Sequence, residues 1–325
     1  MPDIISHWLL GRRICKDSAF AALYPDIDQA AFLWGCQGPD ILFCHRTMPC
    51  QSGSIRSYGS ALHRGDPAKL LRSLGKVCRY CMGRTDFNII YSYALGFCCH
   101  YCYDRSVHPL VHYNMELLEK TDERGSNYQY HALTEINLDV MLLRHDMGLT
   151  ISDLNLSDCL PECDGIDTAV AVLYSLLLCD LFGIHTPREA AMTLAADFRT
   201  HTSLRNDSHF VKKPVAEAAE RLLPFVRPGT KGGTLSCRFH PKTEDTSFDY
   251  GNMTGSVWFE PKDKSVRYNL NYYELTDKAQ VESMQLMELF SDETEQRGSV
   301  NFDLKLPTRK RGMKPQKQGK NGIKK

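Results

Sequence analysis

The sequence lacks a run of about 18 uninterrupted apolar residues, the usual minimum for a helix that spans a membrane. Its longest apolar stretch, residues 169–182, is interrupted by Ser175 and Asp180, and we interpret it as a core helix. Residues 1–16 also lack a basic segment followed by a long apolar run and a cleavage site, so we expect no signal peptide. These absences predict a cytoplasmic protein.

The sequence also lacks an excess of charge of either sign, because 39 basic residues balance 39 acidic ones. The distribution is uneven, since residues 305–325 contain nine Lys or Arg and no acid. We expect residues 293–325 to form a basic, disordered tail, because such a composition has almost nothing to bury. This tail would either keep the chain soluble or contact an anionic surface such as lipid or nucleic acid.

Cysteine is plentiful, at 13 residues, and the odd number excludes complete intramolecular pairing. Free thiols fit a reducing compartment. Cys78 with Cys81 and Cys99 with Cys102 form two C-x-x-C pairs, spaced as in a four-thiolate zinc site. Because the second pair lies in an apolar, aromatic run that predicts a continuous helix, we interpret all four as buried free cysteines.

Hydrophobic periodicity predicts an all-α protein, a multi-helix bundle around a polynuclear metal site, with a small loop-rich β excursion near the C-terminus. We expect a helical metal-binding domain over residues 1–228, a loop and β excursion with a closing helix on the same domain over 229–292, and the tail over 293–325. The expected helices cover residues 16–31, with an interruption near Pro25, and 67–81, 87–107, 109–120, 128–146, 166–182, 187–200, 213–225 and 276–290. Residues 53–59 are expected to be a flexible connection, Thr186–Glu189 a capping box, and 234–239 and 256–260 short alternating runs.

Two stretches place metal-ligand side chains at intervals of four residues. Because an α-helix advances about 100° per residue, each set forms a stripe along one helical face. Two such helices can direct imidazoles and carboxylates into one shared cavity, which is how metal sites form inside helical bundles. The stripes are His100, Asp104 and His108 in the first stretch and His131, Glu135 and Asp139 in the second.

Three further candidates lie upstream, and with the two stripes, Asp139 excepted, they make a set rich in imidazole that contains three carboxylates. Such a set suits zinc better than manganese, iron or nickel. Eight ligands exceed the needs of one tetrahedral ion, so we expect at least two metals. The candidate ligands are His7, Asp40, His63, His100, Asp104, His108, His131 and Glu135.

The order of these residues resembles the zinc-dependent phospholipase C family of bacteria, whose superfamily also includes zinc-dependent single-strand nucleases. The motifs are a histidine, Gly-Pro-Asp, a second histidine, H-x-x-x-D-x-x-x-H-P and H-x-x-x-E. The resemblance covers roughly residues 1–225, with a weaker continuation through Trp258 and the helix after Tyr272. It implies an all-helical domain whose zinc ions hydrolyse phosphodiesters, here in a cytosolic-type member.

The resemblance also divides the ligands among ions: Asp40, His63, His100 and Asp104 for the first, His108, His131 and Glu135 for the second, and Asp104 with His7 for a third. In secreted members an amino-terminal tryptophan helps to bind the third ion, whereas this chain begins Met1-Pro2. The number of zinc ions, two or three, therefore stays open, and so does a role for the terminal amine.

Two ligand positions have alternatives. Secreted relatives place five residues between the bridging aspartate and the next histidine, whereas Asp104 and His108 enclose three, so His112 competes with His108. We favour His108, because Pro109 predicts the start of a new helix and a ligand at that break would be well placed. For Asp139 we predict a supporting role, in which it accepts an N–H from a metal-bound histidine.

These features predict a zinc-dependent hydrolase of phosphate esters, a phospholipase C-like phosphodiesterase that uses a metal-activated hydroxide. Asp40 is the candidate catalytic residue, either as a ligand or as general base. The alternatives are a non-catalytic metal-binding or regulatory protein and a nuclease of the same superfamily. A phospholipid head group is a plausible substrate, whereas nucleic acid needs aromatic stacking platforms. The tyrosines that could supply them lie on an apolar helix, which favours core positions: Tyr91, Tyr93, Tyr101 and Tyr103.

Overall fold

The computed structural model describes residues 4–47, 51–121, 126–226 and 235–295. Over these ranges the chain forms α-helices around one buried core, short 3-10 helices and one two-stranded antiparallel sheet, which confirms the expected all-α class. The α-helices are α1 (Ile4–Cys15), α2 (Ser18–Leu23), α3 (Gln29–Gly35), α4 (Ser57–Arg64), α5 (Pro67–Cys81), α6 (Phe87–Thr121), α7 (Asn127–Met147), α8 (Ile166–Phe182), α9 (Arg188–Ala191), α10 (Leu194–Arg205), α11 (Lys212–Val226) and α12 (Tyr272–Glu295). The other elements are η1 (Gly38–Cys44), η2 (Ile151–Asp153), η3 (Leu156–Cys159), η4 (Ser236–Arg238), β1 (Trp258–Glu260) and β2 (Asp263–Tyr268).

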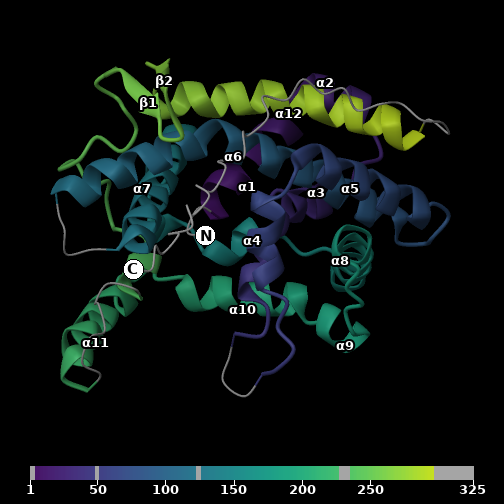
Figure 1. Cartoon of the computed structure of the whole chain (residues 1–325), viewed down its shortest axis with the longest axis horizontal. Coiled ribbons are helices and arrows are strands. Elements are labelled where there is room, and N and C mark those ends of the chain that lie inside the picture. Colours follow the sequence, from purple (N-terminus) through teal and green to yellow (C-terminus); the bar gives the residue numbers. More distant parts are fainter. Residues whose placement is uncertain (1–3, 48–50, 122–125, 227–234, 296–325) are drawn as a thin grey trace, which may run out of the picture.

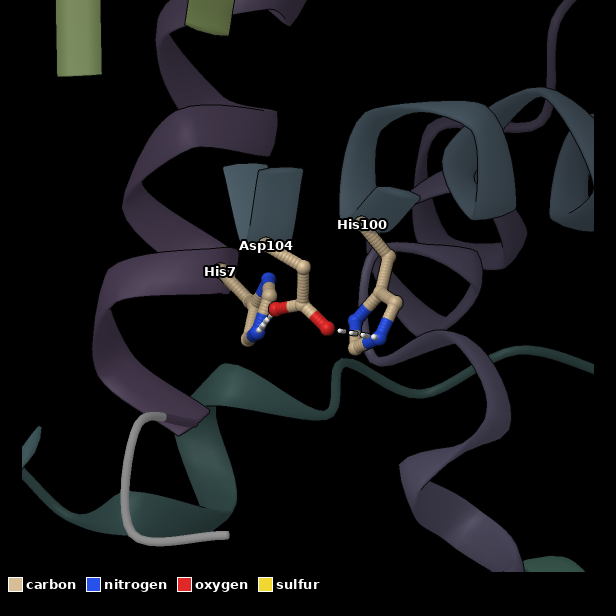
Figure 2. Close-up of side chains that lie close together, drawn as sticks. All are labelled: His7, His100 and Asp104. Atoms are coloured by element: carbon tan, nitrogen blue, oxygen red, sulfur yellow. Dashed lines mark ion pairs between the residues drawn. The ribbon is translucent and has the colours of Figure 1, made fainter. Parts of the chain in front are cut away.

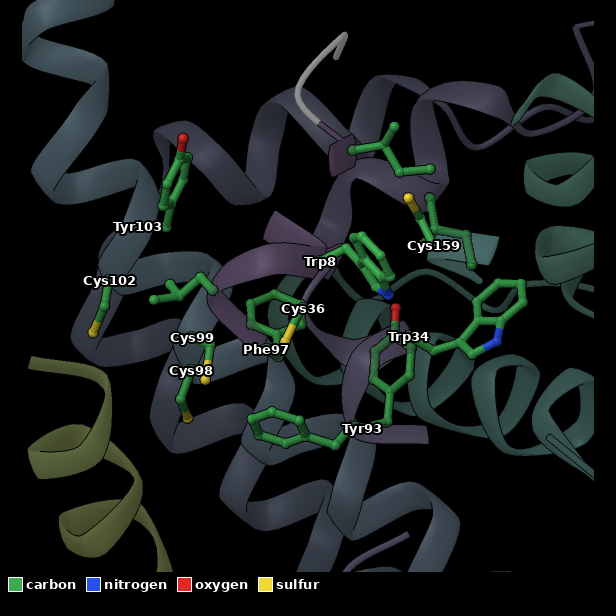
Figure 3. Close-up of a cluster of buried hydrophobic side chains, with 14 of the residues drawn as sticks. Trp8, Trp34, Cys36, Tyr93, Phe97, Cys98, Cys99, Cys102, Tyr103 and Cys159 are labelled. Carbon is green, nitrogen blue, oxygen red and sulfur yellow. The ribbon is translucent and has the colours of Figure 1, made fainter. Parts of the chain in front are cut away.

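Helix α6 is the central element, and α12, α3 and α7 all pack against it (Figure 1). Its apolar and aromatic sequence buries side chains on several faces, including Tyr93 and Phe97. These side chains share a cluster with Trp8 from α1 and Trp34 from α3 (Figure 3). The core therefore joins the amino-terminal helices to the middle of the chain.

The break expected at Pro109 is wrong, because α6 continues through this residue to Thr121. Proline lacks the backbone N–H and crowds the carbonyl four residues earlier, which disfavours a helix interior. Here the flanking residues Val107, Leu110 and Val111 are all buried in the core. Their burial offsets the cost of the proline, so tertiary packing overrides the local signal.

The helix expected over residues 16–31, with an interruption near Pro25, forms as two separate helices, of which the second extends beyond the expected end to Gly35. Asp17 accepts a hydrogen bond from the Ala19 N–H and Asp28 from the Ala31 N–H, both at 2.8 Å. Each aspartate therefore caps a separate helix, α2 and α3. The interruption expected near Pro25 is confirmed, and Asp28 is the residue at which the second helix begins.

The capping box expected at Thr186–Glu189 does not form. Pro187 has an extended ψ of 137°, so α9 begins only at Arg188, without a side-chain cap, and α10 begins separately at Leu194. Residues 234–239 include the 3-10 helix η4 where an alternating run was expected, whereas β1 lies within the expected run 256–260. Helix α4 begins at Ser57, inside the expected connection.

None of the described helices combines the length and apolarity needed to cross a membrane. Helix α12 extends to Glu295, and so includes the first residues of the expected basic tail. The rest of that tail, residues 296–325, and the amino-terminal residues 1–3 lie outside the described ranges.

Two glycines let α3 and α6 cross at backbone contact. A Cβ at Gly35 would lie 2.1 Å from the Tyr93 carbonyl oxygen, and one at Gly96 would lie 2.1 Å from the Phe32 carbonyl oxygen. No other residue fits either position without moving a helix. The crossing brings His100, one turn beyond Gly96, close to the turn that follows α3.

Gly96→Ala should lower the free energy of unfolding by about 1–3 kcal/mol, because the added methyl group forces the two backbones apart. Gly75→Ala, in α5, is the matched control. Its Cβ would meet nothing closer than 3.6 Å, so we expect a gain of about 0.5–1 kcal/mol from better helix propensity. Urea unfolding measures both changes, and equal stability of the two variants would contradict the close crossing.

Candidate metal centre

All eight predicted ligands lie in three groups, in each of which one ligand atom per residue lies within 4.8 Å of the others. The side chains come from α1, η1, α4, α6 and α7. The groups are Asp40, His63 and His100; His7, His100 and Asp104; and His108, His131 and Glu135. Because His100 belongs to the first two groups, and Asp104 contacts residues of all three, they form one continuous centre.

The first group has the spacing of a tetrahedral site. His63 Nε2 lies 3.0 Å from Asp40 Oδ1 and 3.3 Å from His100 Nε2. Asp104 Oδ2 lies 3.6 Å from His63 Nε2 and 3.3 Å from His100 Nε2. Ligand atoms about 2.0–2.1 Å from a tetrahedral zinc ion are about 3.3 Å from one another. The donor types and their separations therefore fit zinc.

Asp104 connects the groups through its two carboxylate oxygens. While Oδ2 faces His63 and His100, Oδ1 lies 3.4 Å from His7 Nε2 and 3.2 Å from His108 Nε2. Figure 2 shows the carboxylate between the imidazoles of His7, from α1, and His100, from α6. The rings of His7 and His100 stack with centroids 4.3 Å apart. This arrangement suits a carboxylate shared between cations.

The third group lies between α6 and α7. His131 Nε2 and His108 Nε2 lie 2.7 Å and 3.7 Å from the same oxygen of Glu135. The His112 ring borders the group, with centroids 5.9 Å from His108 and 5.6 Å from His131. His108 is thus one turn beyond Asp104 on a continuous helix, and His112 stays an alternative.

The turn η1 that carries Asp40 is held by two buried tyrosines. The hydroxyls of Tyr93 and Tyr174 lie 3.2 Å and 2.5 Å from the Gly38 carbonyl oxygen, to which they donate. Gly38 has φ +49°, and a Cβ there would lie 2.3 Å from the His100 ring. Glycine is therefore required both for the backbone conformation and for the close approach of Asp40 to His100.

Backbone carbonyls orient two of the histidines. His63 Nδ1 lies 2.7 Å from the Gly59 carbonyl oxygen, and His100 Nδ1 lies 3.2 Å from that of Cys36. When Nδ1 donates to a carbonyl, Nε2 keeps its lone pair for a metal. Phe43 stacks on the His63 ring with centroids 5.4 Å apart. Sequence reasoning missed these supports, because a carbonyl group carries no residue-specific signal.

Mutual electrostatics prepare the centre for a cation. Burial alone would raise the pKa of Asp104, but the charges and hydrogen bonds of His108 and His100 hold it well below its usual range. Burial alone would lower the pKa of His63, but its hydrogen bond with Asp40 and the charge of that carboxylate raise it. Carboxylate anions therefore attract protons to the imidazoles, and a metal cation competes for the same positions.

The centre is buried on one side and accessible on the other. The side chains of His63, His108 and His131 are 22%, 20% and 24% exposed. In contrast, His7 and Glu135 are 1% and 3% exposed. A ligand from solution can therefore approach along the edge formed by the three accessible imidazoles.

Asp139 contacts Ser6 and His240, neither of which is among the predicted ligands, so its predicted contact with a metal-bound histidine stays a prediction. Its Oδ1 accepts hydrogen bonds from the Ser6 N–H at 2.7 Å and the Ser6 hydroxyl at 2.5 Å, and its Oδ2 lies 2.8 Å from His240 Nε2. Ser6 lies in the first turn of α1, where backbone N–H groups lack partners within the helix. Asp139 therefore fixes the start of the helix that carries His7. His240, which sequence reasoning missed, contacts the second carboxylate oxygen of Asp139.

The four cysteines of the two C-x-x-C pairs are buried, and no described cysteine belongs to a candidate metal group. This agrees with the interpretation as free thiols. Burial raises the pKa of Cys98 and Cys99 well above the usual value, so both stay protonated and weakly nucleophilic.

Comparison with known protein families gives a match to the model of the zinc-dependent phospholipase C family over residues 6–167. The chain belongs to this family. The matched segment contains every candidate ligand from His7 to Glu135, whereas α10, α11, α12 and the β hairpin lie beyond it. Neither the curated proteins nor the solved structures gave a match. The family is zinc-dependent, and the three groups of ligand atoms can hold metal ions.

Asp104→Asn should mainly lower the metal content, whereas Asp139→Asn should mainly lower the free energy of unfolding. Asp104→Asn removes the charge between the groups, so we expect metal content to fall with little recovery in added zinc. Asp139→Asn should retain metal in the groups without His7, but lower the free energy of unfolding by about 1–3 kcal/mol, because the amide replaces one of the two oxygens that contact Ser6 and His240. Elemental analysis and urea unfolding measure the two effects. Equal metal loss in both variants would contradict these roles.

In the metal-free protein, the raised pKa of His63 should make the free energy of unfolding depend on pH. Protonated His63 beside Asp40 stabilises the fold fully below pH 6.5, the usual value, and this contribution is lost as pH rises through the higher folded pKa. The difference in unfolding free energy between wild type and Asp40→Asn should therefore shrink as pH rises. Urea unfolding in chelator across this range measures it. A difference that grows with pH would refute the assignment.

Proposed function

We propose that this protein is a zinc-dependent hydrolase of phosphate esters, a phospholipase C-like phosphodiesterase. The observation that carries the proposal is the position of Asp104, whose two carboxylate oxygens each lie within 3.6 Å of two imidazole nitrogens. A closed structural zinc site uses four protein ligands around one ion. Eight ligands in linked groups favour a polynuclear centre, which is typical of phosphoester hydrolysis.

We assign the ligands by the groups in which they lie. Membership of the family and the measured separations both support this assignment. His7 has the fewest companions, so the ion that it shares would be the most weakly held. The proposed sets are Asp40, His63, His100 and Asp104 for one zinc ion, His108, His131 and Glu135 for a second, and Asp104 with His7 for a third. The terminal amine, a further possible ligand to the third ion, lies outside the described residues.

Bound zinc would polarise the phosphoryl oxygens and lower the pKa of a water molecule to about 7, which supplies a nucleophile at neutral pH. Two zinc ions carry more positive charge than the three carboxylates balance, so the centre attracts a phosphate anion. Asp40 is held beside His63 by the rigid turn η1, as a ligand or as the base that orients the attacking water. The exposed edges of His63, His108 and His131 leave access for the ester.

Two observations disfavour other chemistries. The cysteines near the centre, Cys98 and Cys99, are protonated by burial and unsuited to nucleophilic attack. Tyr93 and Tyr103 are 1% and 2% exposed and cannot stack on nucleic-acid bases, and Tyr91 and Tyr101 are half-buried against the core. A phosphoester with a small or lipid head group therefore fits better than a single-stranded nucleic acid.

Purified protein should contain at least two zinc ions per chain and hydrolyse a soluble chromogenic phosphodiester. Chelation should abolish hydrolysis, zinc should restore it, and His131→Ala should lower kcat by at least about 100-fold, as expected when a metal ligand is removed. Elemental analysis and steady-state kinetics measure these outcomes. One metal ion or none, with no hydrolysis, would favour a non-catalytic binding protein.

Substrate choice is tested by comparing short-chain phosphatidylcholine with a single-stranded oligonucleotide. Faster hydrolysis of the lipid supports the phospholipase assignment, whereas faster cleavage of the oligonucleotide assigns the nuclease alternative.

His7→Ala in a chelator titration separates two ions from three, because loss of the most weakly held ion in this variant indicates a third site.

A further inference from the structure

The first residue of α12 contributes a buried hydroxyl group beside the metal centre. Helix α12 runs along α6 (Figure 1). The hydroxyl oxygen of Tyr272 lies 2.9 Å from Ser6 Oγ and 2.7 Å from the Tyr103 hydroxyl oxygen. Ser6 directly precedes His7 on α1, and Tyr103 directly precedes Asp104 on α6. One side chain of α12 therefore joins the two helices that carry these ligands.

The backbone of Tyr272 is held at a capped helix start. Its N–H donates to the Gly251 carbonyl oxygen at 2.8 Å. The Asn271 N–H donates to Glu274 Oε2 at 2.8 Å, and the Glu274 N–H donates to Asn271 Oδ1 at 3.0 Å. This reciprocal cap satisfies backbone groups that lack partners within the first turn. The Tyr272 hydroxyl is therefore placed by a fixed end of a long helix.

The hydrogen bonds of this cluster run in one direction. Asp139 Oδ1 accepts the Ser6 O–H at 2.5 Å, because a carboxylate has no proton to donate. A hydroxyl group has one proton, so Ser6 Oγ must accept its second hydrogen bond from Tyr272. Tyr272 has then used its own proton and accepts from Tyr103. We call Tyr103, Tyr272 and Ser6 the hydroxyl chain, which ends at Asp139.

Burial makes each link of the hydroxyl chain matter. Tyr272, Ser6 and Asp139 are 0% exposed, and Tyr103 is 2% exposed. A buried hydroxyl group that loses its partner is not compensated by solvent. Linked hydrogen bonds in such surroundings also strengthen one another. The chain therefore favours one arrangement, and it fixes the position of the Tyr103 ring.

That ring contacts His7. The two rings lie at 61° with centroids 4.7 Å apart, and the His100 ring stacks on His7 with centroids 4.3 Å apart. His7 is 1% exposed, and its Nε2 lies 3.4 Å from Asp104 Oδ1. The hydroxyl chain thus holds His7 twice, through the Tyr103 ring and through the backbone at Ser6. A ligand whose orientation is fixed before binding holds a metal ion more tightly.

We propose that Tyr272 and Tyr103 are positioning residues for His7, and that they set how tightly this histidine holds the metal ion it shares with Asp104. The inference deepens the proposed function and rests on it, because it concerns the third ion of the proposed centre. Both tyrosines act through His7 and are not assigned as metal ligands. Helix α12 thereby takes part in the metal centre, although it lies outside the segment that matches the family model.

Tyr272→Phe removes one oxygen atom and keeps the ring. The zinc-loaded full chain is dialysed against rising chelator concentrations, and elemental analysis gives the zinc retained per chain. The dissociation constant of the first ion to leave should rise at least about tenfold, as when a partner of a metal ligand is lost. The other ions should leave as in wild type. Tyr103→Phe, which keeps the bond between Tyr272 and Ser6, should weaken the same ion.

Tyr24→Phe is the matched control. The Tyr24 hydroxyl oxygen lies 3.1 Å from Ser291 Oγ, about 28 Å further along α12 than Tyr272. This variant also removes a hydroxyl contact with α12, so it should retain zinc as wild type does. Equal zinc loss in Tyr24→Phe and Tyr272→Phe would show a general effect on packing and would overturn the proposal. So would wild-type retention in both Tyr272→Phe and Tyr103→Phe.

A double variant separates positioning from a merely structural role. Because Tyr272 acts through His7, His7→Ala/Tyr272→Phe should retain the same zinc as His7→Ala alone. Further loss in the double variant would show that Tyr272 acts on another ion, which contradicts the proposal.

Failure of this proposal is distinguishable from failure of the proposed function. If His7→Ala retains as much zinc as wild type, the positioning role is overturned, whereas hydrolysis of the soluble phosphodiester by two zinc ions keeps the proposed function. Selective weakening of one ion in Tyr272→Phe, in a protein that hydrolyses no phosphodiester, keeps the positioning role and removes the enzymatic assignment.

Discussion

The candidate metal centre is organised around one half-buried carboxylate. Asp104 lies on the central helix with two imidazole nitrogens near each of its oxygens, from three different elements of the fold. Protonated imidazoles this close together repel one another. Their positive charge must be balanced by anions, or the protons must be replaced by metal ions. The low pKa of Asp104 shows that its anionic form is the one that this environment favours.

The rest of the fold delivers partners to this carboxylate. The glycine crossing of α3 and α6 sets His100 against η1, and Gly38 allows η1 to bring Asp40 within reach. Asp139 and His240 fix the start of α1 and hence the position of His7. The last contact joins the family segment to a residue beyond it, so the later part of the chain helps to position α1 through Asp139.

The candidate ligands and helix α11 lie in different parts of the chain. Residues 6–167 carry the ligands and match the family model, whereas α11 carries an outward apolar face and no candidate ligand. Access to the centre lies along the imidazoles of His63, His108 and His131.

The sequence by itself determined the all-α class, the two ligand stripes and the family, because helical periodicity and residue spacing are local properties. Its errors at Pro109 and at the capping box at Thr186 arose where distant packing or the local backbone conformation prevailed over a sequence signal. Only the tertiary structure decided that Asp104 faces four histidines, that Asp139 holds Ser6, and that α11 points its apolar side outward. These facts depend on contacts between residues as many as 133 positions apart, which no local pattern encodes.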